Sequence, residues 1–120
     1  MNKILMVDDS LSMRQVIGFF LRRAGYQVEE AANAREALEK AERGEFRLVL
    51  TDVKMPGIDG LELVRRLRAM ERYRTTPILT LTTLNARDDR DEGRAAGATG
   101  WIVKPFAEEK LLSTVQRVMG

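Results

Sequence analysis

The chain has 120 residues, 44% of them hydrophobic, which predicts one domain over residues 1–120 with a single core. Its 20 Lys and Arg residues are mixed with 18 Asp and Glu residues, so the formal net charge of +2 does not indicate a nucleic-acid surface. The chain contains no Cys and no His, which excludes thiolate and imidazole metal ligands as well as a histidine base.

No apolar stretch approaches the roughly 20 residues that a membrane span requires. The N-terminus also lacks the charged, apolar and small-residue regions of a signal peptide. We therefore expect a cytoplasmic protein that does not insert into membranes, with a monomer as the expected state of a lone domain.

Short apolar runs alternate along the chain with segments whose apolar residues recur at helical spacing. In chain order these features predict strand 4–7, helix 13–24, strand 27–31, helix 34–43, strand 48–52, helix 63–70, strand 78–82, helix 86–96, strand 101–103 and helix 111–119. Ser10 and Asn33 are the expected N-caps of the first two helices, and Gly25 and Gly44 their expected ends.

Five strand-helix units in succession predict an α/β fold with a parallel sheet, helices on both faces and right-handed crossovers. The run 48–50 has no polar alternation, as expected for a strand that is covered on both faces. The segment 86–96 carries few apolar residues, so we expect it to be the helix least firmly anchored to the core.

Polar side chains follow four of the predicted strands. Because the carboxyl ends of parallel strands meet at one edge of a sheet, we expect Asp8, Asp9, Asp52, Thr82 and Lys104 to converge there. Three carboxylates in one place repel one another and raise each other's pKa unless a cation lies among them. Oxygen ligands without imidazole or thiolate favour a hard ion such as Mg²⁺.

Each of these residues also has an ordinary structural interpretation. Asp8 or Asp9 could cap the first helix, Thr82 could be a strand residue, Lys104 could be a solvated lysine and Trp101 a core ring. The convergence of the polar residues at one sheet edge favours a site, because independent structural roles would not produce it.

Three stretches carry a resemblance to a known family, and they are ILMVDDS at residues 4–10, TDVKMPGIDG at 51–60 and GATGWIVKPF at 97–106. Together they resemble the receiver domain of two-component response regulators, of the stand-alone chemotaxis (CheY-like) type. The resemblance implies a flavodoxin-like (βα)5 doubly wound sandwich with strand order 2-1-3-4-5, an order known for this family and not worked out from the residues.

The resemblance also implies a role for each site residue. Asp52 would be the phosphoacceptor, and the metal would be bound by Asp9 directly, by Asp8 largely through water, by Asp52 and by the backbone carbonyl of Lys54. The implied ion is Mg²⁺, with Mn²⁺ as an alternative. Lys104 would pair with a phosphoryl oxygen.

The same resemblance implies a switch. Thr82 would hydrogen-bond the attached phosphoryl group, and Trp101 would then turn inward and alter the face formed by the fourth helix, fifth strand and fifth helix. Lys54 and Leu84 flank the expected path of the hydrolytic water, so both would influence the lifetime of the phosphoryl group. Leu84 cannot hydrogen-bond that water, which predicts slower self-dephosphorylation than in a Leu84→Glu variant.

A protein of this kind is a signalling phosphoacceptor, not an enzyme in the usual sense, although it catalyses its own phosphoryl transfer and dephosphorylation. Its implied partners are a histidine kinase as phosphodonor and a target protein such as a flagellar motor switch component. Alternatives are a phosphate-sink or non-chemotaxis receiver and a phosphohydrolase of the haloacid dehalogenase type. The latter normally carries Asp-x-Asp after its first strand, which this chain lacks. A flavodoxin-like nucleotide binder would need a phosphate-binding loop after that strand, and none is present.

Overall fold

The computed structural model describes residues 2–83 and 87–119, without the side chains of residues 83–90, and this part of the chain contains a five-stranded parallel sheet. Its elements in chain order are β1 (Lys3–Val7), α1 (Leu11–Arg23), β2 (Gln27–Ala31), α2 (Ala34–Arg43), β3 (Leu48–Asp52), α3 (Gly60–Ala69), a short 3-10 helix η1 (Glu71–Tyr73), β4 (Ile78–Thr83), α4 (Arg87–Ala96), β5 (Gly100–Lys104) and α5 (Glu108–Met119). The strand order is β2-β1-β3-β4-β5, which confirms the expected fold.

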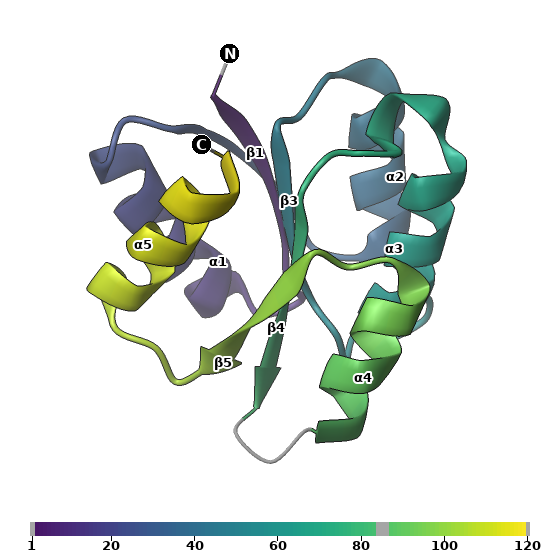
Figure 1. Cartoon of the computed structure of the whole chain (residues 1–120). Coiled ribbons are helices and arrows are strands. Elements are labelled where there is room, and N and C mark those ends of the chain that lie inside the picture. Colours follow the sequence, from purple (N-terminus) through teal and green to yellow (C-terminus); the bar gives the residue numbers. More distant parts are fainter. Residues whose placement is uncertain (1, 84–86, 120) are drawn as a thin grey trace.

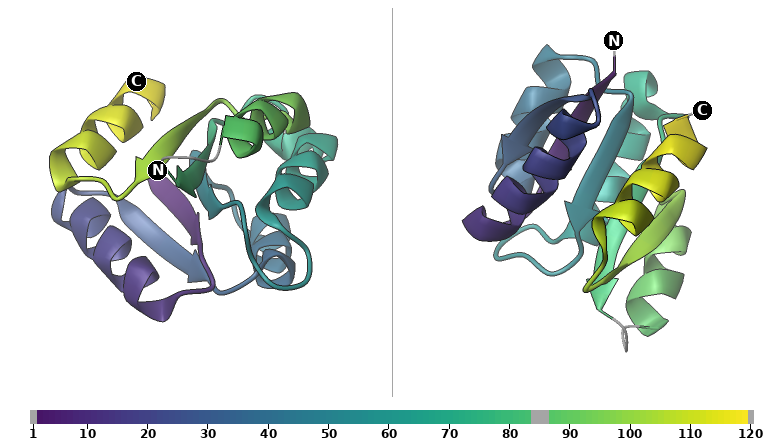
Figure 2. Two further views of the ribbon diagram at one scale, coloured as in Figure 1. Left: turned by 90° about the horizontal axis from the view of Figure 1, so that it is seen from below. Right: turned by 90° about the vertical axis from the view of Figure 1, so that its left-hand side faces the viewer.

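The helices form one layer on each side of the sheet. Figures 1 and 2 show α1 and α5 on one face and α2, α3 and α4 on the other. The central strands supply both cores: within β3, Leu48 and Leu50 pack with α1 and α5, whereas Val49 packs with α2 and α3. Because successive strand residues point to opposite faces, the continuous apolar runs of the sequence are explained by burial on both sides.

Local capping chemistry places the helix starts close to the predicted ones. The side chains of Ser10 and Asn33 accept hydrogen bonds from backbone amides of the first turns of α1 and α2, as expected. The third helix begins at Gly60, three residues before the predicted start, because Asp59 caps it by accepting from the Glu62 amide at 2.9 Å. No helix in the described part of the chain has the length and apolar character needed to cross a bilayer.

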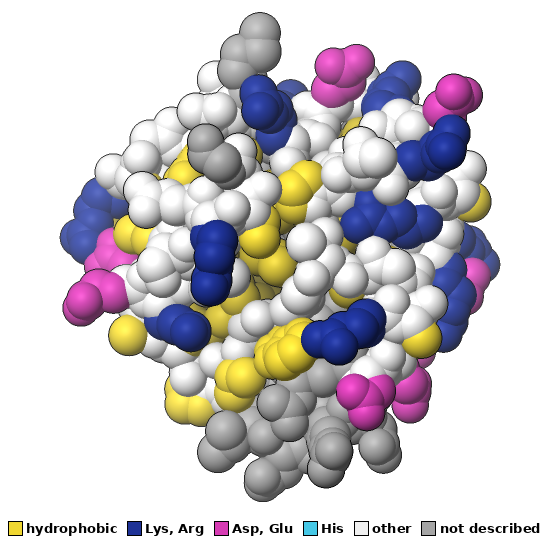
Figure 3. Space-filling model, viewed as in Figure 1, with side chains coloured by type: hydrophobic (Ala, Val, Ile, Leu, Met, Phe, Trp, Pro, Cys, Tyr) yellow, Lys and Arg dark blue, Asp and Glu magenta, His cyan; other side chains and the backbone are white. Residues whose placement is uncertain are grey.

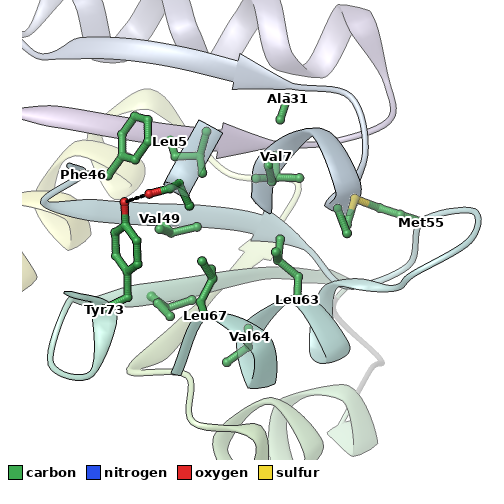
Figure 4. Close-up of a cluster of buried hydrophobic side chains, with 14 of the residues drawn as sticks. Leu5, Val7, Ala31, Phe46, Val49, Met55, Leu63, Val64, Leu67 and Tyr73 are labelled. Carbon is green, nitrogen blue, oxygen red and sulfur yellow. Dashed lines mark hydrogen bonds between the residues drawn. The ribbon is translucent and has the colours of Figure 1, made fainter. Parts of the chain in front are cut away.

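The short helix η1 was not predicted, and it contributes a fully buried tyrosine to one of the two cores. Tyr73 lies among the buried side chains of this core (Figure 4), and its hydroxyl donates to the carbonyl oxygens of Ala41 at 2.7 Å and Gly44 at 2.9 Å. Both carbonyls belong to the end of α2, where the last carbonyl groups of a helix lack intrahelical donors. Tyr73 therefore ties the connection before β4 to the C-terminus of α2.

Replacing Tyr73 with Phe is expected to lower the free energy of unfolding by about 0.5–1.5 kcal/mol, because it removes the hydrogen bonds of the buried hydroxyl while Arg72 Nη1 still donates to the Ala41 and Gly44 carbonyls and the ring remains packed. Equilibrium urea unfolding measures this loss. Tyr26→Phe is the matched control, since no hydrogen bond of the Tyr26 hydroxyl is found among the described residues. Equal effects of the two substitutions would contradict the role of the Tyr73 hydroxyl.

Candidate functional site

Strand register brings the predicted acidic residues together at the carboxyl edge of the sheet. Val7, the last residue of β1, is paired with Thr51 of the neighbouring β3, so Asp8 and Asp52 follow at the same level. Asp9 comes one residue later in the turn before α1. One carboxylate oxygen from each of these three aspartates lies within 4.8 Å of the others.

The cluster differs in burial from one member to the next. Asp8 is buried, Asp52 is half-buried and Asp9 is exposed, so the group opens to solvent on the side of Asp9. All three donors are carboxylate oxygens, the ligands that hard divalent cations take, and a site with few carboxylates leaves room for water and phosphate oxygens. The residues therefore fit Mg²⁺.

Lys104 reaches the cluster from the end of β5, across β4. Its Nζ lies 3.3 Å from Asp52 Oδ2 and 3.5 Å from Asp8 Oδ2. The Lys104 side chain is only 20% exposed, so solvent screens this charge less than that of a surface lysine. The amine thus lies against two of the three carboxylates, as predicted.

The Asp52 carboxylate is held on both of its oxygens. Oδ1 accepts a hydrogen bond from the Val53 amide at 2.9 Å, and Oδ2 faces Lys104. Burial raises the pKa of Asp52 above its ordinary value, and the charge of Asp8 adds to this effect, while Lys104 and the Val53 amide oppose it. Ionised Asp52 is therefore under electrostatic strain that a bound cation would relieve.

This raised pKa predicts that Asp52→Asn stabilises the metal-free fold at pH 7. A carboxyl whose pKa is raised in the folded state contributes stability below its unfolded value of about 3.8, and this contribution is lost as the pH rises through the folded pKa. The variant should therefore melt a few degrees above the wild type at pH 7 in EDTA, with the difference disappearing as the pH falls towards 3.8. Thermal melts from pH 4 to 8 measure this, with the exposed Asp59→Asn as control. A pH-independent difference would contradict the interpretation.

Thr82 and Trp101 lie on the same side of the sheet as each other. Thr82 is buried on β4, one residue beyond Leu81, which is paired with Asp52. Trp101 is paired with Thr80 on β5, and the guanidinium of Arg94 from α4 lies 5.3 Å from the centre of its ring. Alternate strand residues share a face, so Thr80, Thr82 and Trp101 all point towards α4.

The other predicted residues are Lys54, Leu84 and the segment 86–96, and the structure describes them only in part. Lys54 is exposed in the turn after β3, and Leu84 lies outside the described residues. The segment expected to be weakly anchored does form α4, from Arg87, while residue 86 also lies outside the described part. Within residues 91–96 the buried positions are Gly93 and Ala96, which agrees with weak apolar anchoring.

Two residues of the site had no predicted role. Gly60 lies so close to β3 that a Cβ built on it would overlap the carbonyl oxygen of Asp52 and would lie 2.9 Å from Val53 Cα. Arg14 donates from Nη1 to the carbonyl oxygen of Asp8 at 2.6 Å. For Gly60 the sequence does give a signal, because Asp59-Gly60 precedes a helical pattern and indicates a helix start. Nothing in the sequence distinguishes Arg14 from the other arginines on helices.

Comparisons with known proteins agree with this geometry. The family model described as the response regulator receiver domain matches residues 4–116. The chemotaxis protein CheY of Pseudomonas aeruginosa is 38% identical over 117 residues, covering 97% of this chain and 94% of that protein. The transcriptional regulatory protein ResD of Bacillus subtilis is 36% identical over 117 residues, covering 98% of this chain. This chain spans 48% of ResD, about half the length of such regulators.

Solved structures show the same similarity. The chemotaxis protein CheY4 of Vibrio cholerae has a TM-score of 0.94 and 51% identity, with 98% of both chains covered. The receiver domain of the sensor histidine kinase PA1611 from Pseudomonas aeruginosa has a TM-score of 0.92 and 34% identity, covering 99% of this chain and 98% of that one. That structure is described with a magnesium ion coordinated in the active site cleft.

Proposed function

This chain belongs to the response regulator receiver domain family, and we propose that it accepts a phosphoryl group on Asp52 from a phosphohistidine of a histidine kinase. Receiver domains are signalling proteins and not classical enzymes, and membership of this family removes the support for a haloacid dehalogenase. The observation that carries the proposal is the position of the Asp52 carboxylate, 3.3 Å from the Lys104 amine and within 4.8 Å of the Asp8 and Asp9 carboxylates.

Phosphoryl transfer needs positioning and charge compensation more than covalent chemistry from the protein. A carboxylate oxygen of Asp52 forms the new P–O bond as the P–N bond to the donor imidazole breaks. The electron pair of the broken bond stays on the imidazole nitrogen. Because these 120 residues contain no histidine, the donor phosphohistidine lies outside them.

We assign the metal to Asp9 directly, to Asp8 largely through water, to Asp52 and to the backbone carbonyl of Lys54. A bound Mg²⁺ would offset the repulsion between the carboxylate and the incoming phosphoryl oxygens, and Mn²⁺ has similar ligand preferences. The all-oxygen donor set supports this assignment.

We propose that Lys104 and Thr82 bind the phosphoryl group once it is attached to Asp52. Lys104 would exchange one of its carboxylate contacts for a phosphoryl oxygen, forming a charge-assisted pair. The buried Thr82 hydroxyl would hydrogen-bond a second phosphoryl oxygen. Its movement would leave space on the side of the sheet where Trp101 lies, and Trp101 would then turn inward.

The output face in this proposal is formed by α4, β5 and α5. Figure 3 shows apolar side chains gathered over the middle of this face, with Lys and Arg side chains around them. A hollow of about 260 Å³ lies between β5 and α5, with Gly100, Trp101, Arg117 and Val118 among its lining residues. A rearrangement of Trp101 would change this hollow, which supports the face as the binding site for a target protein.

The similarity to two chemotaxis proteins supports a target in chemotaxis, such as a flagellar motor switch component. We also propose that the protein acts in the cytoplasm as a monomer. Lys54 and Leu84 keep their proposed influence on the lifetime of the phosphoryl group.

Mass spectrometry after incubation with acetyl phosphate and Mg²⁺ tests the proposed function. The wild type should gain one phosphoryl group, located on Asp52 by peptide mapping after borohydride trapping. Asp52→Asn should gain none, while Asp59→Asn, which changes a nearby acid that caps α3, should be modified like the wild type. Absence of the modification, or its location on another residue, would overturn the proposal.

A further inference from the structure

Arg14 connects the first turn of α1 to the turn that carries the acidic residues. Its Nη1 donates to the carbonyl oxygen of Asp8 at 2.6 Å, and its Nε lies 3.5 Å from Glu30 Oε1 on β2. The Arg14 side chain is only 13% exposed. The Arg14 guanidinium therefore links the Glu30 carboxylate to the carbonyl group of Asp8.

All four polar groups of Asp8 have partners. Its amide donates to the Ala31 carbonyl at 3.1 Å, its carbonyl accepts from Arg14, its Oδ1 accepts from the Ser10 amide at 2.9 Å, and its Oδ2 faces Lys104. Asp8 is 1% exposed, so water cannot easily replace a lost donor. Removing Arg14 would leave the Asp8 carbonyl unpaired and free this peptide to rotate.

Glu30 in turn holds the guanidinium in place. Its carboxylate lies between Arg14 and Arg22, which are eight residues apart on α1, with Oε2 3.2 Å from Arg22 Nη1. Gly18 lies between the two arginines, and a Cβ there would lie 3.2 Å from Glu30 Oε2, so the glycine leaves room for the carboxylate. Residues four apart share a helix face, so Arg14, Gly18 and Arg22 together form the surface of α1 against which the Glu30 carboxylate packs.

We propose that Arg14 is a positioning residue for the metal site: by holding the Asp8 peptide, it directs the Asp8 and Asp9 carboxylates towards the cation. This inference rests on the proposed function, because it concerns the same cation. Two effects of Arg14 oppose each other, since its positive charge repels a cation while its hydrogen bond orders the ligands. The carboxylate of Glu30, which also pairs with Arg22, offsets part of this positive charge, and we expect the ordering effect to dominate.

Isothermal titration calorimetry with Mg²⁺ tests this role. Arg14→Met should bind Mg²⁺ about tenfold more weakly than the wild type, the usual cost of losing a group that orients metal ligands. It should also show a smaller rise in melting temperature on adding Mg²⁺. Arg14→Lys keeps the charge but cannot contact both Asp8 and Glu30, so its affinity should lie between those of Arg14→Met and the wild type.

Arg22→Met is the matched control. Arg22 also pairs with Glu30, but its other contact is the carbonyl of Val28 and not that of Asp8, so its loss should weaken Mg²⁺ binding far less than the loss of Arg14. Equal or tighter binding by Arg14→Met, or an equal loss in Arg22→Met, would overturn the inference. If Arg14→Met does not fold in EDTA, Arg14→Lys provides the same comparison. A wild type that does not bind Mg²⁺ would instead refute the metal assignment of the proposed function.

Discussion

Lys104→Met is expected to slow phosphorylation of Asp52 by acetyl phosphate about 100-fold at a fixed donor concentration, the scale on which enzymes lose rate when one preorganised charged donor is removed. The Lys104 amine already lies 3.3 Å from Asp52 Oδ2 in the unphosphorylated protein. It therefore needs little movement to reach a phosphoryl oxygen, and a methionine of similar length offers no charge there.

Two measurements separate the effects of Lys104. Rapid-quench mass spectrometry gives the rate of phosphorylation, and Trp101 fluorescence with Mg²⁺ and beryllofluoride reports whether the switch still responds. Lys110→Met removes the same charge from the exposed surface of α5 and should change neither. A rate for Lys104→Met within threefold of the wild type would contradict the proposed contact between Lys104 and the phosphoryl group.

Gly60→Ala is expected to lower the free energy of unfolding by about 1–3 kcal/mol, the range for overpacking a tightly packed site. At an ordinary helix position this change would stabilise the protein by up to about 1 kcal/mol. Here the new Cβ would overlap the Asp52 carbonyl oxygen and would lie 2.9 Å from Val53 Cα, both of them backbone atoms that cannot rotate away. The steric overlap therefore outweighs the gain in helix propensity, and Gly60→Ala destabilises the fold.

The same substitution should impair phosphorylation, because α3 must move away from the end of β3 that carries Asp52. The Gly60 amide donates to the Val53 carbonyl at 2.8 Å, so this movement would also disturb the turn towards Lys54. Gly44→Ala is the control: its Cβ would have its nearest contacts at 3.5–3.7 Å, and its φ of -123° suits alanine. Urea unfolding and the phosphorylation assay should both distinguish the two variants, and equal stability would contradict the close approach.

The sequence by itself determined the alternation of strands and helices and the edge at which the site forms. Apolar runs and helical spacing are local signals, and Ser10 and Asn33 cap the helices that they were predicted to cap. The convergence of Asp8, Asp52 and Lys104 was also predictable, because all strands of a parallel sheet end at the same edge. The strand order came from the family resemblance, since spacing alone does not decide which strands are neighbours.

Only the tertiary structure decided which individual atoms meet. The contact between Lys104 and Asp8 joins residues 96 positions apart, and Tyr73 reaches a carbonyl 32 positions away. The closeness of Gly60 to β3 and the hydrogen bond of Arg14 to the Asp8 carbonyl likewise depend on how neighbouring elements pack. Residue type and spacing set local conformation, whereas such contacts depend on backbone approach and side-chain direction after packing, so local patterns could not reveal them.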